Sequence, residues 1–230
     1  MTTVAVNLQA VRTRIEQACK AAGRPPDAVR LLAVSKTFGA DAVREAAAAG
    51  QRDFGENYVA EGVEKIRACA DLGLTWHCIG PLQSNKTRLV AEHFDWVHSI
   101  DRLKVAERLS AQRPATLPPL QVCIQVNIDG GATKAGVAPQ EAAALARAVA
   151  ALPRLRLRGL MTIPEPAANA QAALAVHRRT RALFDALVAE GLPLDTLSMG
   201  MSADLEAAVA AGSTLVRVGT AIFGGRTRQG

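Results

Sequence analysis

Residues 31–36 read Leu31-Leu32-Ala33-Val34-Ser35-Lys36, an apolar run that ends in a lysine. A short continuous apolar run is typical of a strand that is buried on both faces of a parallel sheet. The lysine stands where this strand would end. Burial of an unpartnered lysine is rare and favours the neutral amine, which can attack an aldehyde and form a Schiff base. Lys36 is therefore the leading candidate for chemistry, and a lysine that reaches solvent from a strand end is the alternative.

Further apolar runs follow the first one, and amphipathic alanine-rich segments lie between most of them. We predict strands at residues 31–35, 52–55, 75–79, 95–100, 120–127, 155–161, 196–199 and 214–218. The intervening segments predict helices at residues 40–49, 57–69, 84–93, 102–112, 139–152, 169–190 and 203–211. One more amphipathic helix is expected at about residues 4–22, before the first strand.

Strands that alternate with helices predict a parallel sheet. Eight such units in a chain of 230 residues fit a (β/α)8 TIM barrel at the small end of its size range. The alternative is a doubly wound open sheet, which usually carries a glycine-rich GxGxxG motif in its first turn. The first turn here reads Ser35-Lys36-Thr37-Phe38-Gly39 and lacks that motif, so the α/β barrel is favoured.

Length, composition and charge restrict the class of protein. A chain of 230 residues that is 49% hydrophobic and 21% charged fits a single globular domain over residues 1–230. It has no apolar stretch long enough to span a membrane and no N-terminal secretory signal, so we expect a cytoplasmic protein that does not bind membranes. The net charge of +6 is scattered and aromatic residues are few, which argues against nucleic-acid binding.

Cysteines and histidines show no spacing that is typical of a metal or redox site. We therefore expect no bound metal. The cysteines fall in strand-like or helix-like runs and are interpreted as small buried side chains in a reducing compartment. They are Cys19, Cys69, Cys78 and Cys123.

In a TIM barrel the functional residues lie at the carboxyl ends of the strands. Two of these ends suit an anion. Ser202 stands at or near the N-cap of the helix predicted from residue 203, and Gly219-Thr220 begins the turn after the last strand. Helix N-termini offer free N–H groups, and glycine permits close backbone approach, so both features favour phosphate. An ordinary serine cap and an ordinary glycine turn are the alternative.

Closure of the barrel would place the last strand beside the first, so that the Gly219-Thr220 turn neighbours Lys36. An amine beside a phosphate site is the arrangement that a phosphorylated aldehyde requires. Arg217 is unusual in its apolar run, and an inward-facing arginine there needs a partner. A ring nitrogen, a carboxylate and a structural salt bridge are the options that the sequence leaves open.

Longer motifs now point to a family. In order along the chain they are LLAVSKT (31–37), RDFGENYVAE (52–61), WHCIGPLQSNK (76–86), TKAGV (133–137), GLMTIPEP (159–166), SMGMSADLEAAV (198–209) and VRVGTAIFG (216–224). These motifs resemble the pyridoxal phosphate homeostasis proteins, single-domain relatives of the barrel half of alanine racemase. The resemblance covers about residues 5–225. It implies a (β/α)8 barrel of the alanine racemase N-terminal type.

The resemblance also implies a role for each candidate residue. Lys36, in the VSKT segment, would hold pyridoxal 5'-phosphate as a Schiff base. The phosphate would be bound by Ser202, Gly219 and Thr220, the pyridine nitrogen would face Arg217, and Asn57 would lie beside the cofactor. The family pattern often has a second lysine two positions after Lys36, where this chain has Phe38. An auxiliary role for Lys134 is open, and a solvated loop lysine is the simpler interpretation.

The implied function is to carry and buffer the cofactor in the cytoplasm, as part of vitamin B6 homeostasis and without robust catalysis. Partners would be pyridoxal phosphate and, transiently, the apo forms of pyridoxal-phosphate enzymes. Monomer and weak dimer both remain open. The alternative is a pyridoxal-phosphate-dependent amino-acid racemase.

A racemase needs an acid or base on each face of its substrate. In alanine racemase, a tyrosine from a partner subunit serves the second face and a second domain completes the site. Lys36 supplies one base here, and the chain is expected to end with the barrel. Tyr58 is the only tyrosine in the sequence, and nothing in the sequence places it opposite Lys36. The carrier is therefore the favoured function.

Overall fold

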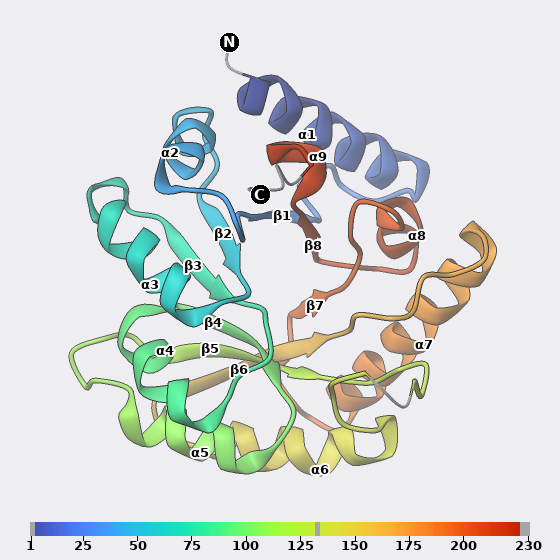
Figure 1. The fold of residues 1–230 in the computed structure, drawn as a ribbon. Coiled ribbons are helices and arrows are strands. Elements are labelled where there is room, and N and C mark those ends of the chain that lie inside the picture. Colours follow the sequence, from blue (N-terminus) through green and yellow to red (C-terminus); the bar gives the residue numbers. More distant parts are fainter. Residues whose placement is uncertain (1–2, 132–133, 226–230) are drawn as a thin grey trace.

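The computed structural model of the chain describes residues 3–131 and 134–225, and within them eight parallel strands close into a barrel. Each strand pairs with the next along the chain, and the last pairs with the first (Figure 1). The predicted TIM barrel is therefore confirmed. The strands are β1 (Arg30–Val34), β2 (Asp53–Glu56), β3 (Thr75–Cys78), β4 (Trp96–Ile100), β5 (Leu120–Gln125), β6 (Leu155–Met161), β7 (Thr196–Ser198) and β8 (Leu215–Val218).

Helices surround the barrel on its outside, as Figure 1 shows. They are α1 (Thr3–Ala21), α2 (Ala40–Ala48), α3 (Val59–Ala68), α4 (Thr87–His93), α5 (Leu103–Gln112), α6 (Pro139–Ala150), α7 (Ala170–Ala189), α8 (Leu205–Ala210) and α9 (Thr220–Phe223). Two short 3-10 turns, η1 (Ala70–Leu72) and η2 (Ser84–Lys86), accompany α3 and α4. None of the helices in the described part of the chain is both long and apolar enough to cross a membrane.

The N-terminal helix α1 is present as predicted and packs against α8 and α9 (Figure 1). Asn7 donates a hydrogen bond to the carbonyl oxygen of Ile222 (3.0 Å), and Arg14 forms an ion pair with Glu206. The sequence did not predict α9, because four residues are too few to show a helical period. The first and last helices of the chain therefore lie together over the seam between β8 and β1.

Side chains alternate along each strand between the barrel interior and the outer core. In β1, Leu32 and Val34 face inward and form a small cluster with Ile79 and Leu215. Ala33, between them, packs in the outer core against the helices. The alternation explains why Lys36, two residues after Val34, lies at the mouth of the barrel rather than under a helix.

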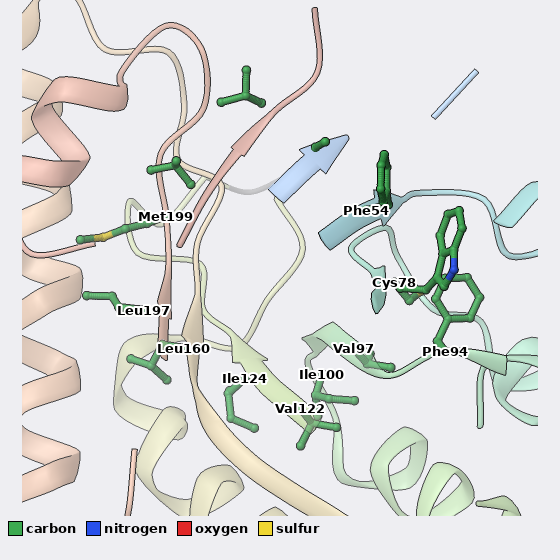
Figure 2. Close-up of a cluster of buried hydrophobic side chains, with 14 of the residues drawn as sticks. Phe54, Cys78, Phe94, Val97, Ile100, Val122, Ile124, Leu160, Leu197 and Met199 are labelled. Carbon is green, nitrogen blue, oxygen red and sulfur yellow. The ribbon is translucent and has the colours of Figure 1, made fainter. Parts of the chain in front are cut away.

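The main hydrophobic core lies between the barrel and its helices. Figure 2 shows part of it, in which Phe54, Leu160 and Leu197 extend from the strands toward the surrounding helices. All three are fully buried. Burial of one such side chain contributes about 1.5–3 kcal/mol, so this layer supplies the main stabilisation of the fold. The cysteines are buried free thiols, as predicted.

Candidate functional site

The predicted site residues come together at the carboxyl ends of the strands. Lys36, Asn57, Ser202, Arg217, Gly219 and Thr220 all line one cavity of about 510 Å³. The apolar side chains of Val34, Ile79 and Ile163 form part of its wall. The juxtaposition follows from barrel closure, because β8 pairs with β1 through Ala33 and Val218, directly below the turns that carry Gly219 and Lys36.

Lys36 is half-buried, between the buried lysine and the lysine that reaches solvent, the two interpretations that the sequence left open. It lies in the turn after β1, at the edge of the cavity, where the strand has already left the core. The buried lysine of this region is Lys65 of α3, which is 5% exposed. Its Nζ donates to Glu56 Oε1 (2.9 Å) and Glu61 Oε1 (2.6 Å), so a buried cation is matched by two carboxylates.

The turn that carries Lys36 is held on both sides. Lys65 Nζ donates to the carbonyl oxygen of Ser35 (2.7 Å), and the backbone N–H of Thr37 donates to Glu61 Oε1 (2.6 Å). Thr37 has a φ of 68°, a left-handed conformation that is uncommon for a β-branched residue. These two hydrogen bonds stabilise the conformation of Thr37. They also fix the backbone on both sides of Lys36.

Glu56 anchors this arrangement from β2. Its Oε1 accepts a hydrogen bond from the Ser35 hydroxyl (2.5 Å) as well as from Lys65. Burial raises the pKa of Glu56, although the hydrogen bonds from Ser35 and Lys65 oppose the shift. Ser35 and Lys65 therefore offset part of the cost of burying a charge on Glu56, whose other oxygen, Oε2, has no hydrogen-bond partner among the described residues.

Arg217 of β8 faces the interior of the barrel and is 4% exposed. Its Nη1 donates to the carbonyl oxygen and to the hydroxyl of Ser198 (both 2.7 Å), and its Nη2 donates to the carbonyl oxygen of Thr162 (2.8 Å). Burial lowers the pKa of Arg217 to about 10, so the guanidinium still carries its charge at neutral pH. None of the ion pairs within the described residues includes Arg217, so a structural salt bridge does not account for it.

Gly219 and Thr220 form the start of α9. Gly219 is its N-cap, and its carbonyl oxygen accepts from the N–H of Ile222 (2.9 Å), which leaves the N–H groups of Thr220 and Ala221 without a partner within the helix. A Cβ at Gly219 would lie 3.0 Å from the carbonyl oxygen of Val34, closer than ordinary van der Waals contact. Glycine therefore lets the end of β8 approach β1, and the free N–H groups line the same cavity as Lys36.

Ser202 lies in the turn before α8, near its N-cap but not at it, because the helix begins two residues later than predicted. The N-cap is Asp204, whose Oδ1 accepts a hydrogen bond from the N–H of Met201 in this turn (2.7 Å) and not from the helix. The other carboxylate oxygen of Asp204 contacts His177 Nε2 (2.8 Å). Ser202 remains at the cavity, and its carbonyl oxygen accepts from Arg14 of α1 (2.8 Å).

Asn57, directly after β2, brings an unsatisfied acceptor to the cavity. Its Oδ1 is buried and has no hydrogen-bond partner among the described residues. A buried polar atom without a partner is costly, so such an atom at a cavity indicates a site for an external donor. Gly80 keeps the neighbouring turn close, since a Cβ there would lie 2.2 Å from the carbonyl oxygen of Asn57.

The donor set of the cavity suits a ligand of defined chemistry. A primary amine, a buried guanidinium and free backbone N–H groups line it together with an apolar wall. An amine can bond to an aldehyde, N–H groups at a helix start favour phosphate, and apolar side chains favour a flat ring. The residues present therefore fit a phosphorylated aromatic aldehyde.

Two further residues that the sequence singled out lie apart from this lining. Tyr58 is 56% exposed and occupies the N-cap position of α3. Lys134 forms an ion pair with Glu165 (3.5 Å). Within the described ranges, no group of three or more His, Cys, Asp or Glu side chains gathers in a geometry that could hold a metal ion.

Sequence reasoning missed the residues that support Arg217. They are Thr162, Ser198, His98 and His77, all fully buried and all hydrogen-bonded in the interior or at its upper end. The sequence signal that could have found them is the alternation of inward-facing and outward-facing residues along each strand. His98 falls two residues after the inward-facing Trp96, and Ser198 is two residues from Thr196 in a strand whose middle residue, Leu197, faces the outer core.

Comparison with known proteins gives a consistent result. The model of the family described as "Alanine racemase, N-terminal domain" matches residues 6–227. Proteins named pyridoxal phosphate homeostasis protein are 62% identical in Pseudomonas aeruginosa (98% of this chain and 97% of that protein) and 57% identical in Escherichia coli K12 (98% of each). The structure of PipY from Synechococcus elongatus PCC7942 with PLP bound is 40% identical, has a TM-score of 0.83, and matches 96% of this chain and 100% of PipY.

Proposed function

The chain belongs to the alanine racemase N-terminal domain family and, within it, to the pyridoxal phosphate homeostasis proteins, and from this membership we propose that it binds, carries and buffers pyridoxal 5'-phosphate. The observation that carries the proposal is the cavity that Lys36 shares with Arg217, Gly219 and Thr220. Residues 1–230 act as one cofactor-binding unit in this proposal.

Each residue of the cavity has a defined task in the proposed complex. The Nζ of Lys36 bonds to the aldehyde carbon as a Schiff base. The N–H groups that begin α9, together with Ser202 and Thr220, bind the phosphate. Arg217 presents a cation to the pyridine nitrogen, and the unsatisfied Oδ1 of Asn57 faces the ring.

When bound, the cofactor can stabilise negative charge next to its imine carbon. A cation at the pyridine nitrogen keeps that nitrogen unprotonated and so weakens this capacity. Arg217 is held by Ser198 and Thr162 in a position that suits this effect. The cavity thus offers several contacts to the cofactor, together with an electron sink that is weaker than one with a protonated ring nitrogen.

A carrier fits the residues better than a racemase does. Lys36 offers a base on one face of the cofactor, while Tyr58 is largely exposed and is not among the residues that line the cavity. The relatives in Pseudomonas aeruginosa and Escherichia coli are named for homeostasis and not for a reaction. We therefore propose a cytoplasmic, non-catalytic carrier that delivers cofactor to apo-enzymes through transient contacts.

Borohydride reduction of the loaded protein, followed by peptide mapping, tests the cofactor site. We expect a visible absorption band on loading and a reduced adduct on Lys36. Lys36→Arg should lose that band and keep only phosphate-dependent binding, whereas Lys104→Arg, on the exposed face of α5, should match the wild type. An adduct found mainly on Lys86 or Lys134 in the wild type would show that the site is misassigned.

A second experiment separates carrier from enzyme. The loaded protein is incubated with L- and D-amino acids, and exchange of the α-proton is followed alongside transfer of cofactor to an apo-enzyme. We expect transfer without turnover. Exchange at ordinary enzyme rates, on the order of 1 per second or faster, would favour the racemase alternative.

A further inference from the structure

We propose that His77 and His98 position Arg217 for the bound cofactor, through a chain of hydrogen bonds that crosses the interior of the barrel. The cofactor in this statement is the one assigned under the proposed function. The chain itself is a property of the protein and does not depend on that assignment.

The chain has four links. Asp53 Oδ1 lies 3.0 Å from His77 Nε2, and His77 Nδ1 lies 2.9 Å from His98 Nε2. His98 Nδ1 lies 2.9 Å from the hydroxyl oxygen of Ser198, which in turn accepts from Arg217 Nη1 at 2.7 Å. All four distances are those of good hydrogen bonds. These hydrogen bonds therefore connect Asp53, at the start of β2, without interruption to Arg217, which lines the cavity.

Barrel closure creates this line. Asp53 and His77 lie on the neighbouring strands β2 and β3, and His98 follows on β4. The next link crosses the barrel, from His98 on β4 to Ser198 on β7, residues that are 100 positions apart in the sequence. The chain is thus an interior feature and not part of one sheet edge.

The charged groups at the two ends fix the direction of every link. A guanidinium can only donate, so the hydroxyl oxygen of Ser198 accepts from Arg217. The carboxylate of Asp53 can only accept, so His77 donates from Nε2 and, as a neutral ring, accepts at Nδ1 from His98. The Nδ1 of a neutral His98 is then unprotonated and accepts the proton of the Ser198 hydroxyl. His98 consequently carries its proton on Nε2 and donates it to His77 Nδ1.

By the same reasoning His77 carries its proton on Nε2 and donates to the carboxylate of Asp53. Both imidazoles are neutral in this arrangement, and both are in the Nε2–H form. Every link presents its lone pair toward the cation Arg217 and its proton toward the anion Asp53. The chain therefore stabilises a buried cation without an adjacent carboxylate.

Burial supports the neutral state of both rings, since each is 0% exposed. Burial lowers the pKa of His77, although Asp53 and Asp95 oppose the shift and Arg30 adds to it. Burial, together with the nearby His77, Arg217 and Arg30, holds the pKa of His98 well below its ordinary value. A proton added to His98 would also force Nδ1 to donate to Ser198 and so reverse the link between His98 and Ser198.

The two imidazoles are shielded from water, although the lower end of the chain is not. The ring of Trp96 stacks on His77 with a centroid distance of 5.2 Å. The guanidinium groups of Arg30 and Arg158 lie over Trp96 at 5.6 and 4.9 Å from its centroid. Asp53, which is paired with Arg30, is 20% exposed, so solvent reaches the carboxylate but not His77, which is 0% exposed.

The consequence for the cavity concerns orientation. Arg217 has Ser198 and Thr162 as its hydrogen-bond partners, and the Ser198 hydroxyl is free to turn unless its proton is fixed. His98 fixes that proton, and His77 fixes the tautomer of His98. The two histidines thus hold the guanidinium in one orientation toward the ring of the cofactor without touching it.

Imidazole nitrogen NMR of the apo protein tests the chain directly. We expect His77 and His98 both to be neutral, with the proton on Nε2, at neutral pH. A proton on Nδ1 of His98, or a charged ring at either position, would overturn the proposal. This readout requires neither cofactor nor activity, so it stands even if the proposed function fails.

Variants then test the effect on the cofactor. His98→Phe keeps a ring but cannot accept from Ser198, and should weaken pyridoxal phosphate binding about tenfold or more and shift the visible band. His98→Asn places an acceptor near the position of Nδ1 and should restore most of the affinity and the band. His93→Phe, on α4, is the matched control and should match the wild type. Unchanged affinity and an unchanged band in folded His98→Phe would overturn the positioning role.

Borohydride labelling distinguishes a failure of the positioning role of the histidines from a failure of the proposed cofactor site at Lys36. If Lys36 is labelled in His98→Phe, the cofactor site itself is intact. Any loss of affinity in that variant is then caused by the changed orientation of Arg217. Failure of labelling in the wild type would contradict the proposed function instead, while the NMR result would still decide the chain.

Discussion

Leu32 of β1 is the register partner of Arg217 of β8, across the seam that closes the barrel. This single pairing sets the height of the two strand ends relative to each other. It places the turn after Val34 beside the turn after Val218, so the amine of Lys36 and the N–H groups of α9 share one cavity. A shift of one residue would turn the guanidinium away from the interior.

Arg217→Lys should weaken cofactor binding by about tenfold or more, because an ammonium cannot reproduce the fork that contacts Ser198 and Thr162 together. The visible band of the loaded protein should also shift, since the charge next to the ring nitrogen moves. Titration with pyridoxal phosphate measures both effects. Arg88→Lys, on the exposed surface of α4, is the control, and equal affinities in the two variants would contradict the role of Arg217.

Gly219→Ala should separate the ends of β1 and β8, because the new methyl group would lie 3.0 Å from the carbonyl oxygen of Val34. We expect a loss of about 1–3 kcal/mol in the free energy of unfolding and weaker phosphate-dependent binding. Urea unfolding and cofactor titration measure the two effects. At Gly39 a Cβ would meet no atom within 4 Å, so Gly39→Ala should keep cofactor affinity. Wild-type affinity in Gly219→Ala would argue against this turn as the phosphate site.

Lys65→Met should be strongly destabilising, because it leaves the buried Glu56 and its neighbour Glu61 without their shared cation. Removal of one partner from a buried ion pair costs about 3–5 kcal/mol. The turn that carries Lys36 should also loosen, since Ser35 loses its donor. Urea unfolding gives the first effect, and the rate of borohydride labelling at Lys36 gives the second.

The double variant Lys65→Met with Glu56→Gln provides the internal check on this cluster. Neutralising Glu56 removes the uncompensated buried charge and should restore part of the lost stability. Lys104→Met changes an exposed lysine of α5 and should stay within about 0.5 kcal/mol of the wild type. If Lys65→Met unfolded at the same urea concentration as the wild type, the cluster would have no structural role.

Mild acid should destabilise the protein through its buried histidines. Burial lowers the pKa of both His77 and His98 in the folded state, whereas the unfolded chain titrates near the ordinary value of about 6.5. Below that value the unfolded state binds more protons than the folded state. The free energy of unfolding should therefore fall by up to about 1.4 kcal/mol per pH unit for each histidine, and should not depend on them above about pH 6.5.

Urea unfolding between about pH 7 and about pH 5 measures this slope. Asp53, whose pKa is lowered because its bonds to His77 and Arg30 outweigh burial, adds to the loss only in stronger acid. Glu56 acts in the opposite direction, because its raised pKa makes the folded state bind a proton first. His98→Asn should remove about half of the histidine contribution, and a stability that is flat across this range would contradict neutral buried rings.

Most strands were predictable because they are compact apolar runs between helical segments, whereas β2 (Asp53–Glu56) and β7 (Thr196–Ser198) were predicted mainly from their place between helices. β1 was predicted at 31–35 and lies at Arg30–Val34, and β6 was predicted at 155–161 and lies at Leu155–Met161. The carboxyl ends of the strands then identified Lys36, Arg217 and Gly219 as residues of one region, because the strands of a closed parallel barrel all end at the same face, and the family resemblance added Asn57. The roles given to these residues remain predictions.

Other parts of the site were not predictable because they depend on partners distant in sequence. Lys65 looks like a solvated residue of an amphipathic helix, and its burial requires Glu56 from the preceding strand. Ser202 has the sequence of a cap, but the turn extends to Asp204, whose carboxylate contacts Met201 and His177 of α7. His98 meets Ser198 only across the closed barrel, a contact that no local pattern encodes.

The position of α1 over the seam has a consequence for protein synthesis. Asn7 and Arg14 find their partners in Ile222, Ser202 and Glu206, which follow 188 to 215 positions later in the sequence. These contacts of α1 therefore form only after α8 and α9 have been made, and the strand pair that builds the cavity cannot form before β8 has been made. Contacts of such long sequence separation form slowly. A nascent chain of this protein thus has no complete cavity to fill until β8 has left the ribosome.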